Sequence, residues 1–134
     1  MQPFFSSFVF FISYFDIYER NKNNLMKGTH LGEFEELVLL IVAVLYDNAY
    51  GVAIQEEIAR RSGRKVTIST VHSALHRLNK KGYVTSQYGE ATAKRGGRRK
   101  LLFLVSPAGE KALSLSRSLR NDLWDAIPEL AFKF

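Results

Sequence analysis

The sequence predicts a mainly helical α+β fold, and three observations carry this prediction. Nine consecutive apolar residues, 37–45, follow an acidic stretch, and residues 67–82 place apolar side chains at helical spacing. Two short extended runs, residues 83–90 and 100–106, enclose a basic loop that contains two glycines. With 134 residues the chain can bury one core of ordinary size, so we expect a single domain.

The first helix is predicted in GEFEELVLLIVAVLYDN, residues 32–48. Periodicity cannot distinguish a helix from a strand in an unbroken apolar run, but its length and the acidic residues before it favour a helix. A helix that is apolar on every side must be covered on every side, and one small domain rarely supplies both covers. We therefore expect a second subunit to contact this helix, through Leu37, Leu40, Ile41 and Val44.

The second helix is predicted in YGVAIQEEIARRSG, residues 50–63. Val52, Ile54 and Ile58 should mark its buried side, and Gly63 should cap its C-terminus. Its charged residues should be solvated: Glu56, Glu57, Arg60 and Arg61.

The third helix, within residues 67–82, is the most informative one. Thr67 can cap its N-terminus, and Gly82 should end it. Apolar residues recur at i, i+4 and i+7 and define a buried side: Val71, Leu75 and Leu78. The opposite face then carries hydrogen-bonding groups and positive charge without a carboxylate: Ser69, His72, Ser73, His76 and Lys80.

The extended runs YVTSQYGE and KLLFLVS predict a two-stranded hairpin. Residues 94–100, between and at the start of these runs, hold five basic residues and no acidic one: Lys94, Arg95, Arg98, Arg99 and Lys100. A basic glycine loop alone is usually a solvated turn. Beside a polar, basic helix it indicates a surface for nucleic acid.

Pro107 should start the last helix and Pro128 should end it. Apolar residues inside it are spaced three and four apart, which is the pattern of a seam for another helix: Ala112, Leu115, Leu119, Leu123 and Ala126. Trp124, next to this seam, fits either core or dimer packing or the wall of a pocket for an effector.

Residues 1–25 differ from the rest, because they hold six of the ten phenylalanines and carry no net charge. Their apolar part is shorter than the roughly 20 residues of a membrane helix, and they lack the leader and cleavage site of a signal peptide. We expect Met26 to be the true start and residues 1–25 to be upstream sequence read through. A poorly ordered extension and a membrane or export segment are the alternatives.

The composition bounds the function. The chain has 19 basic and 13 acidic residues, a net charge of +6 and a pI near 9.7, which suits a polyanionic partner. Without cysteine it has no disulfide framework, thiolate zinc site or cysteine nucleophile, and a reducing, cytoplasmic location is expected. His72 and His76 lack a third ligand nearby in sequence, so we expect no metal or other cofactor.

The order helix, helix, helix, hairpin is that of a winged helix-turn-helix. In this architecture the third helix enters the major groove of DNA, and the hairpin, or wing, lies along the backbone or minor groove. The two polar, basic surfaces would then face one DNA duplex together.

From residue 31 to about residue 124 the chain resembles the PadR family of bacterial transcriptional regulators. Four blocks carry the resemblance in this order: LGEFEELVLLIV, AYGVAIQEEI, VTISTVHSALHRLNKKGYV and RGGRRKLLFLVSPAG. Because several spaced blocks occur in the right order, the match is more specific than any one of them.

The resemblance implies a homodimeric repressor that binds an inverted repeat in double-stranded DNA, with small hydrophobic or aromatic effectors in some relatives and no membrane role. The DNA contacts implied for this chain are Ser69, Thr70, His72, Ser73, His76, Arg98, Arg99 and Lys100. Two departures stand out: His72 lies where the family commonly has tyrosine, and Leu101 and Leu104 lie where basic residues are common.

The implied organisation is an N-terminal extension (1–25), a winged helix-turn-helix domain (26–106), a C-terminal dimerisation helix (107–127) and a tail (128–134). A nucleic-acid-binding module without sequence specificity is the alternative function, but it would need stacking aromatic residues among the basic ones, and residues 94–100 contain none. An enzyme is not expected, because GGRRK precedes a strand instead of a helix and adjacent acids such as Glu35 and Glu36 point apart on a helix.

Overall fold

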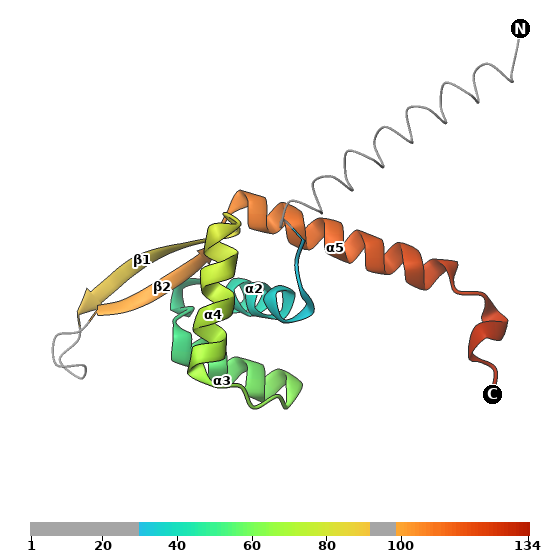
Figure 1. Cartoon of the computed structure of the whole chain (residues 1–134), viewed down its shortest axis with the longest axis horizontal. Helices are drawn as coiled ribbons and strands as arrows, with labels where there is room; N and C mark the ends of the chain where they lie inside the picture. Colours follow the sequence, from blue (N-terminus) through green and yellow to red (C-terminus); the bar gives the residue numbers. More distant parts are fainter. Residues whose placement is uncertain (1–29, 92–98) are drawn as a thin grey trace, which may run out of the picture. The chain divides into compact units, whose positions relative to one another are not determined.

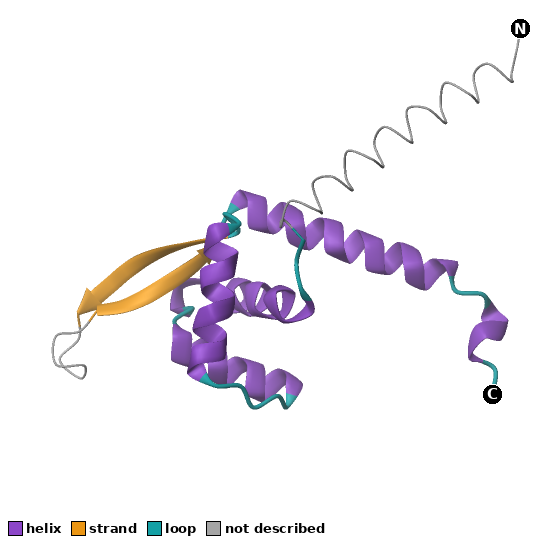
Figure 2. Ribbon diagram, viewed as in Figure 1, coloured by secondary structure: helices purple, strands orange, loops and turns teal. Residues whose placement is uncertain are grey.

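The computed structural model describes residues 30–91 and 99–134, and the helices and strands described belong to one compact unit, Leu31–Phe134. Helices α2 (Glu33–Leu45), α3 (Gly51–Ser62) and α4 (Ile68–Lys80) precede strands β1 (Val84–Ala91) and β2 (Arg99–Val105) and helix α5 (Pro107–Ala126), as Figure 1 shows. Short 3-10 helices, η2 (Tyr46–Asn48) and η4 (Glu129–Phe132), follow α2 and α5. The predicted α+β, mainly helical winged fold is confirmed (Figure 2).

Some predictions lie outside the described residues. They concern the extension, residues 1–25, and the loop residues Lys94, Arg95 and Arg98. All of them stay predictions.

The core lies where α2, α3 and α4 pack on one another. Each helix supplies apolar side chains from one face, and the fully buried ones are Val38, Leu39 and Val42 of α2, Ile54 and Ile58 of α3, and Val71, Leu75 and Leu78 of α4. Tyr83, Val84 and Phe103 extend this cluster to the base of the wing.

The apolar helix α2 is covered mostly by its own domain. Ile41, expected at a subunit contact, is only 3% exposed, because it shares a face with Val38 and Val42 that packs into the core. It has little surface left for a partner. Leu40 and Val44 remain 45% and 52% exposed, while Leu37 is partly buried against the core.

The prediction that Val52 is buried is wrong, since 45% of this residue is exposed. Ile54 and Ile58 lie four residues apart and share one face of α3, whereas Val52 lies two residues before Ile54 and points to the other side. Ala53 takes its place in the buried set.

The predicted helix ends are confirmed. The Thr67 hydroxyl accepts a hydrogen bond from the Thr70 N–H at 3.2 Å, and Gly63 ends α3 in the left-handed conformation with φ 71°. Pro107 occupies the first turn of α5 after the N-cap Ser106, and α5 ends at Ala126, two residues before Pro128.

The wing is an antiparallel pair in which Val84 faces Val105 and Tyr88 faces Leu101. It is tied to the helices by the Phe103 N–H, which donates to the Ala49 carbonyl at 2.8 Å. The side chains at the departures from the family pattern, Leu101 and Leu104, are partly buried. Strand β1 is solvated along most of its length, because four consecutive side chains are exposed: Thr85, Ser86, Gln87 and Tyr88. The wing therefore keeps a polar, exposed strand despite its apolar partner.

Candidate nucleic-acid interface

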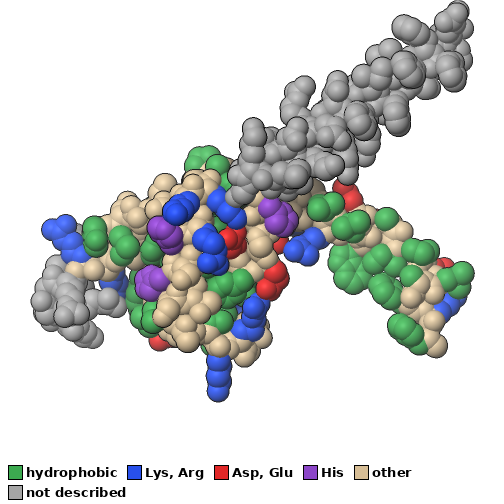
Figure 3. Space-filling model, in the orientation of Figure 1, with side chains coloured by type: hydrophobic (Ala, Val, Ile, Leu, Met, Phe, Trp, Pro, Cys, Tyr) green, Lys and Arg blue, Asp and Glu red, His purple; other side chains and the backbone are tan. Residues whose placement is uncertain are grey.

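The outer face of α4 is a continuous polar surface. Its apolar residues are buried, so the helix turns the others outward. The α4 residues predicted to contact DNA are all exposed: Ser69, Thr70, His72, Ser73, His76 and Lys80. Arg77 and Asn79 are exposed beside them. Figure 3 shows histidine, lysine and arginine side chains gathered over this helix. The predicted faces of the helix are confirmed, and the DNA contacts stay a prediction.

His72 is held at the start of α3. Its imidazole lies so close to Gly51 that a Cβ added there would come within 2.9 Å of both Cε1 and Nε2. Any side chain at Gly51 would push the ring away. A glycine on the neighbouring helix thus sets the position of an exposed, hydrogen-bonding side chain on the predicted reading face.

Lys100, near the loop end of β2, contacts the residue that precedes α3. Its Nζ lies 4.0 Å from the centroid of the Tyr50 ring, which is a cation–π contact. Tyr50 directly precedes Gly51, so a chain of contacts joins the wing to His72. Of the five basic residues predicted for the wing, the structure describes Arg99, which is exposed, and Lys100, which is partly buried.

A buried carboxylate connects α2 to α4. Glu35, 7% exposed, binds Arg77 Nε through Oε1 at 2.8 Å and Lys81 Nζ through Oε2 at 2.6 Å. Burial by itself would raise the pKa of Glu35, but the hydrogen bonds from Lys81 and Arg77 outweigh it and hold this pKa below its ordinary value. Sequence reasoning missed Arg77 and Lys81. Their positions on the flank of a predicted polar helix were the only signal.

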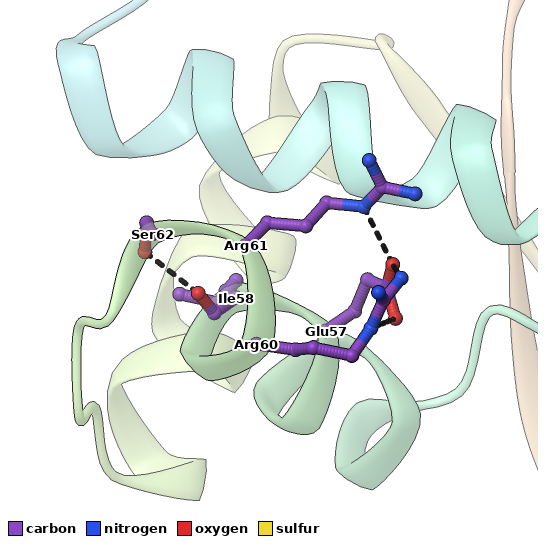
Figure 4. Close-up of polar contacts among 5 residues, drawn as sticks. All are labelled: Glu57, Ile58, Arg60, Arg61 and Ser62. Carbon is purple, nitrogen blue, oxygen red and sulfur yellow. Dashed lines mark hydrogen bonds and ion pairs between the residues drawn. The ribbon is translucent and has the colours of Figure 1, made fainter.

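Further ion pairs surround the helices. Glu57 on α3 accepts hydrogen bonds from Arg60 and from Arg61, the latter at 2.6 Å, while the Ser62 hydroxyl donates to the Ile58 carbonyl (Figure 4). Glu56, Arg60 and Arg61 are exposed as predicted, but the Glu57 side chain is only 13% exposed, because the two arginines cover it. Two pairs were not predicted: Arg64 binds Glu33 at 2.6 Å, and Arg120 of α5 binds Glu36 of α2 at 3.0 Å.

The apolar seam of α5 is uncovered in the single chain. Leu115, Leu119 and Leu123 are each about three-fifths exposed, and Trp124 is 67% exposed. Trp124 packs on Phe132 of η4, with ring centroids 6.2 Å apart. Beside it lies an open hollow of about 450 Å³ lined by Glu36, Leu40, Leu113, Arg117, Arg120 and Trp124.

Two features are absent from residues 30–91 and 99–134. These residues contain no group of three His, Asp or Glu side chains placed to hold a metal ion. Within the same ranges no helix has both the length and the apolar character needed to cross a membrane.

The comparisons with known proteins decide the family. The profile of the transcriptional regulator PadR-like family matches residues 39–115, more than half of the chain. The chain belongs to the PadR family. Since PadR-family proteins bind DNA and regulate transcription, it is a DNA-binding regulator and not an enzyme. A search of curated proteins gave no significant match.

Solved PadR-like structures resemble this one. A PadR family regulator from Clostridium difficile R20291 is 26% identical, with a TM-score of 0.54 over 66% of this chain and 91% of that one. A regulator from Clostridium thermocellum is 25% identical, with a TM-score of 0.56 over 74% and 89%. A PadR family regulator from Eggerthella lenta DSM 2243, 22% identical, shares the fold with a TM-score of 0.57 over 92% and 99%.

Proposed function

We propose that this PadR-family protein is a homodimeric repressor that recognises an inverted-repeat operator through α4 and grips it with the wing. The observation that carries the proposal is the outer face of α4, which is exposed, polar and free of carboxylates over three turns. Such a face offers donors and acceptors to base edges in the major groove, while the wing brings positive charge to the phosphates. On this reading Ser69, His72, Ser73 and His76 read bases, and Thr70, Lys80 and the wing cations hold the backbone.

The uncovered seam of α5 supports the homodimer. Three leucines at a spacing of four residues are exposed in one chain, and a helix from a second copy would cover them. Two-fold symmetry would place the two α4 helices in successive major grooves, which requires half-sites about one helical turn, or a multiple of it, apart.

Selection of DNA fragments by the purified protein tests this function. We expect one enriched palindrome. Enrichment of a sequence without a dyad would contradict the dimeric reading, and binding without any enrichment would support a nucleic-acid-binding module without sequence specificity.

The hollow beside Trp124 supports regulation by a small hydrophobic or aromatic effector. Its apolar lining is Leu40, Leu113 and Trp124, and a flat apolar compound bound on these would contact α5 and α2 at once. The rest of the lining is polar: Glu36, Glu110, Ser114, Arg117, Arg120 and Asn121. The two α4 helices of a dimer could adopt two spacings, of which one fits the operator. A ligand can weaken operator binding by no more than the ratio of its own affinities for these two arrangements.

The effector is tested through Trp124, the single tryptophan of the chain. We expect at least one compound in a panel of planar aromatic molecules both to quench Trp124 fluorescence and to weaken operator binding. If no compound does both, Trp124 serves packing alone.

A further inference from the structure

We infer that Glu35 is a positioning residue for DNA binding, which holds Arg77 so that its guanidinium meets a DNA phosphate at the edge of α4. The inference rests on the proposed function, because it assumes that α4 docks on DNA. It adds two residues that neither the sequence patterns nor the family resemblance assigned to the interface.

The geometry of the cluster is asymmetric. The Glu35 side chain is 8% exposed and that of Lys81 is 19% exposed, whereas half of the Arg77 side chain is exposed. Arg77 is therefore the member of the cluster that reaches solvent. Its bond to Glu35 uses Nε alone, so neither terminal amino group of the planar guanidinium is needed to hold the carboxylate.

The charges of the cluster leave one positive charge in excess. Lys81 alone balances Glu35, so the charge of Arg77 is not cancelled within the cluster. An arginine whose orientation is already fixed loses less side-chain entropy when it binds a second anion. A phosphate oxygen pair is a suitable anion, because two parallel N–H groups can bind it in a fork.

The position of Arg77 on α4 places it beside the reading face. It follows Ser73 by four residues and precedes Lys80 by three, and residues at these spacings are neighbours on a helix surface. When a helix lies in the major groove, its central face meets base edges and its flanks approach the phosphates of the two strands. Arg77 stands on such a flank.

The direction in which Glu35→Gln changes DNA affinity distinguishes a positioning role of Glu35 from a purely electrostatic effect of its charge. Replacing Glu35 by glutamine removes a negative charge near DNA, and charge alone would then strengthen DNA binding. If Glu35 positions Arg77, the same replacement weakens binding, because a neutral amide with one acceptor oxygen cannot hold both Lys81 and the guanidinium as the carboxylate does.

The test measures binding of the full chain to the selected operator and to random duplex DNA over a series of salt concentrations. We expect Glu35→Gln and Arg77→Ala each to weaken binding to both duplexes, on the order of tenfold. Arg77→Ala should also lower the salt slope by about 0.9, the value for one phosphate. The double variant should bind no more weakly than Arg77→Ala alone.

Arg77→Lys separates position from charge. It keeps the positive charge, but it lacks the planar fork in which Nε binds Glu35 while two separate amino groups bind a phosphate, so we expect a loss close to that of Arg77→Ala. Glu57→Gln is the matched control, because Glu57 also holds two cations but both belong to its own helix. It should not weaken binding.

Circular dichroism shows whether each variant is folded. If Glu35→Gln unfolds, the Arg77 variants provide the test, because the Arg77 side chain is half exposed and its replacement should leave the fold intact. Unchanged or tighter binding by folded Glu35→Gln, or an unchanged affinity and salt slope in Arg77→Ala, overturns the inference. If the wild-type chain binds no duplex at all, the proposed function itself fails.

Discussion

Gly109, in the first turn of α5, is the described glycine at which an added Cβ would lie nearest to another segment. A Cβ added there would lie 2.2 Å from the Tyr83 carbonyl oxygen and 3.0 Å from Val105 Cγ1. We expect Gly109→Ala to lower the free energy of unfolding by about 1 to 3 kcal/mol, because backbone must move to admit the methyl group. Urea denaturation measures this loss.

Gly32→Ser is the control for Gly109. A Cβ at Gly32 meets no atom within 4 Å, and serine is a favourable residue at the N-cap of a helix. Its stability should stay within about 0.5 kcal/mol of wild type. An equal loss in both variants would show that the contact with Tyr83 has no special cost.

Individual residues of the proposed interface should differ in what they contribute. Replacing Arg98 and Arg99 by alanine should weaken operator and random DNA by similar factors and lower the salt slope by about 2, because wing cations hold phosphates of any sequence. His72→Ala or Ser73→Ala should cost about 1 to 3 kcal/mol on the operator and leave random DNA almost unchanged. Titrations on both duplexes at several salt concentrations measure the difference.

The same titrations would show if base recognition belongs to the wing and phosphate binding to α4. If the arginine variant loses operator binding alone and keeps its salt slope, the wing reads bases, and α4 supplies the grip.

At the scale of elements, the carboxylate of Glu35 attaches the reading helix α4 to α2. Its pKa is lowered in the folded protein from a value near 4.5, so the folded state binds the Glu35 proton more weakly than the unfolded state does. The stabilisation is therefore fully present above about pH 5 and is lost as the pH falls through the lowered pKa.

Glu35→Gln should accordingly destabilise the protein by about 1 to 3 kcal/mol at pH 7. The difference from wild type should shrink as the pH falls through the lowered pKa of Glu35, because wild-type Glu35 then becomes protonated as well. Denaturation curves of both proteins between about pH 3 and about pH 7 measure this trend. A difference that stays constant with pH would mean that packing, and not the charge of Glu35, joins the two helices.

At the scale of the whole molecule, the exposed leucines of α5 predict a dimer. Sedimentation at micromolar concentration should give twice the mass of one chain, and Leu119→Asp with Leu123→Asp should give a monomer of unchanged helix content, because two buried carboxylates would lose their water. Val52→Asp is the control, since Val52 is an exposed apolar residue on α3, away from the seam. It should stay dimeric, and a monomeric wild type would contradict the assembly.

Local features of the sequence were enough to predict the order of the elements, their ends and the polar face of α4. Thr67, Gly63 and Pro107 act on backbone within one turn, and the spacing of Val71, Leu75 and Leu78 shows which side of a helix is buried. Such signals do not depend on which side chains pack against them. The same kind of signal was therefore enough to predict the two strands of the wing and the apolar seam of α5.

Only the tertiary structure decided which side chains meet. Glu35 binds Arg77 and Lys81, which are 42 and 46 residues away, and Lys100 lies over Tyr50. An unbroken apolar run likewise could not show that Ile41 is covered by its own domain while Leu40 stays exposed. The physical reason is that periodicity gives the direction of a side chain from its own helix, whereas its partner depends on how the helices pack.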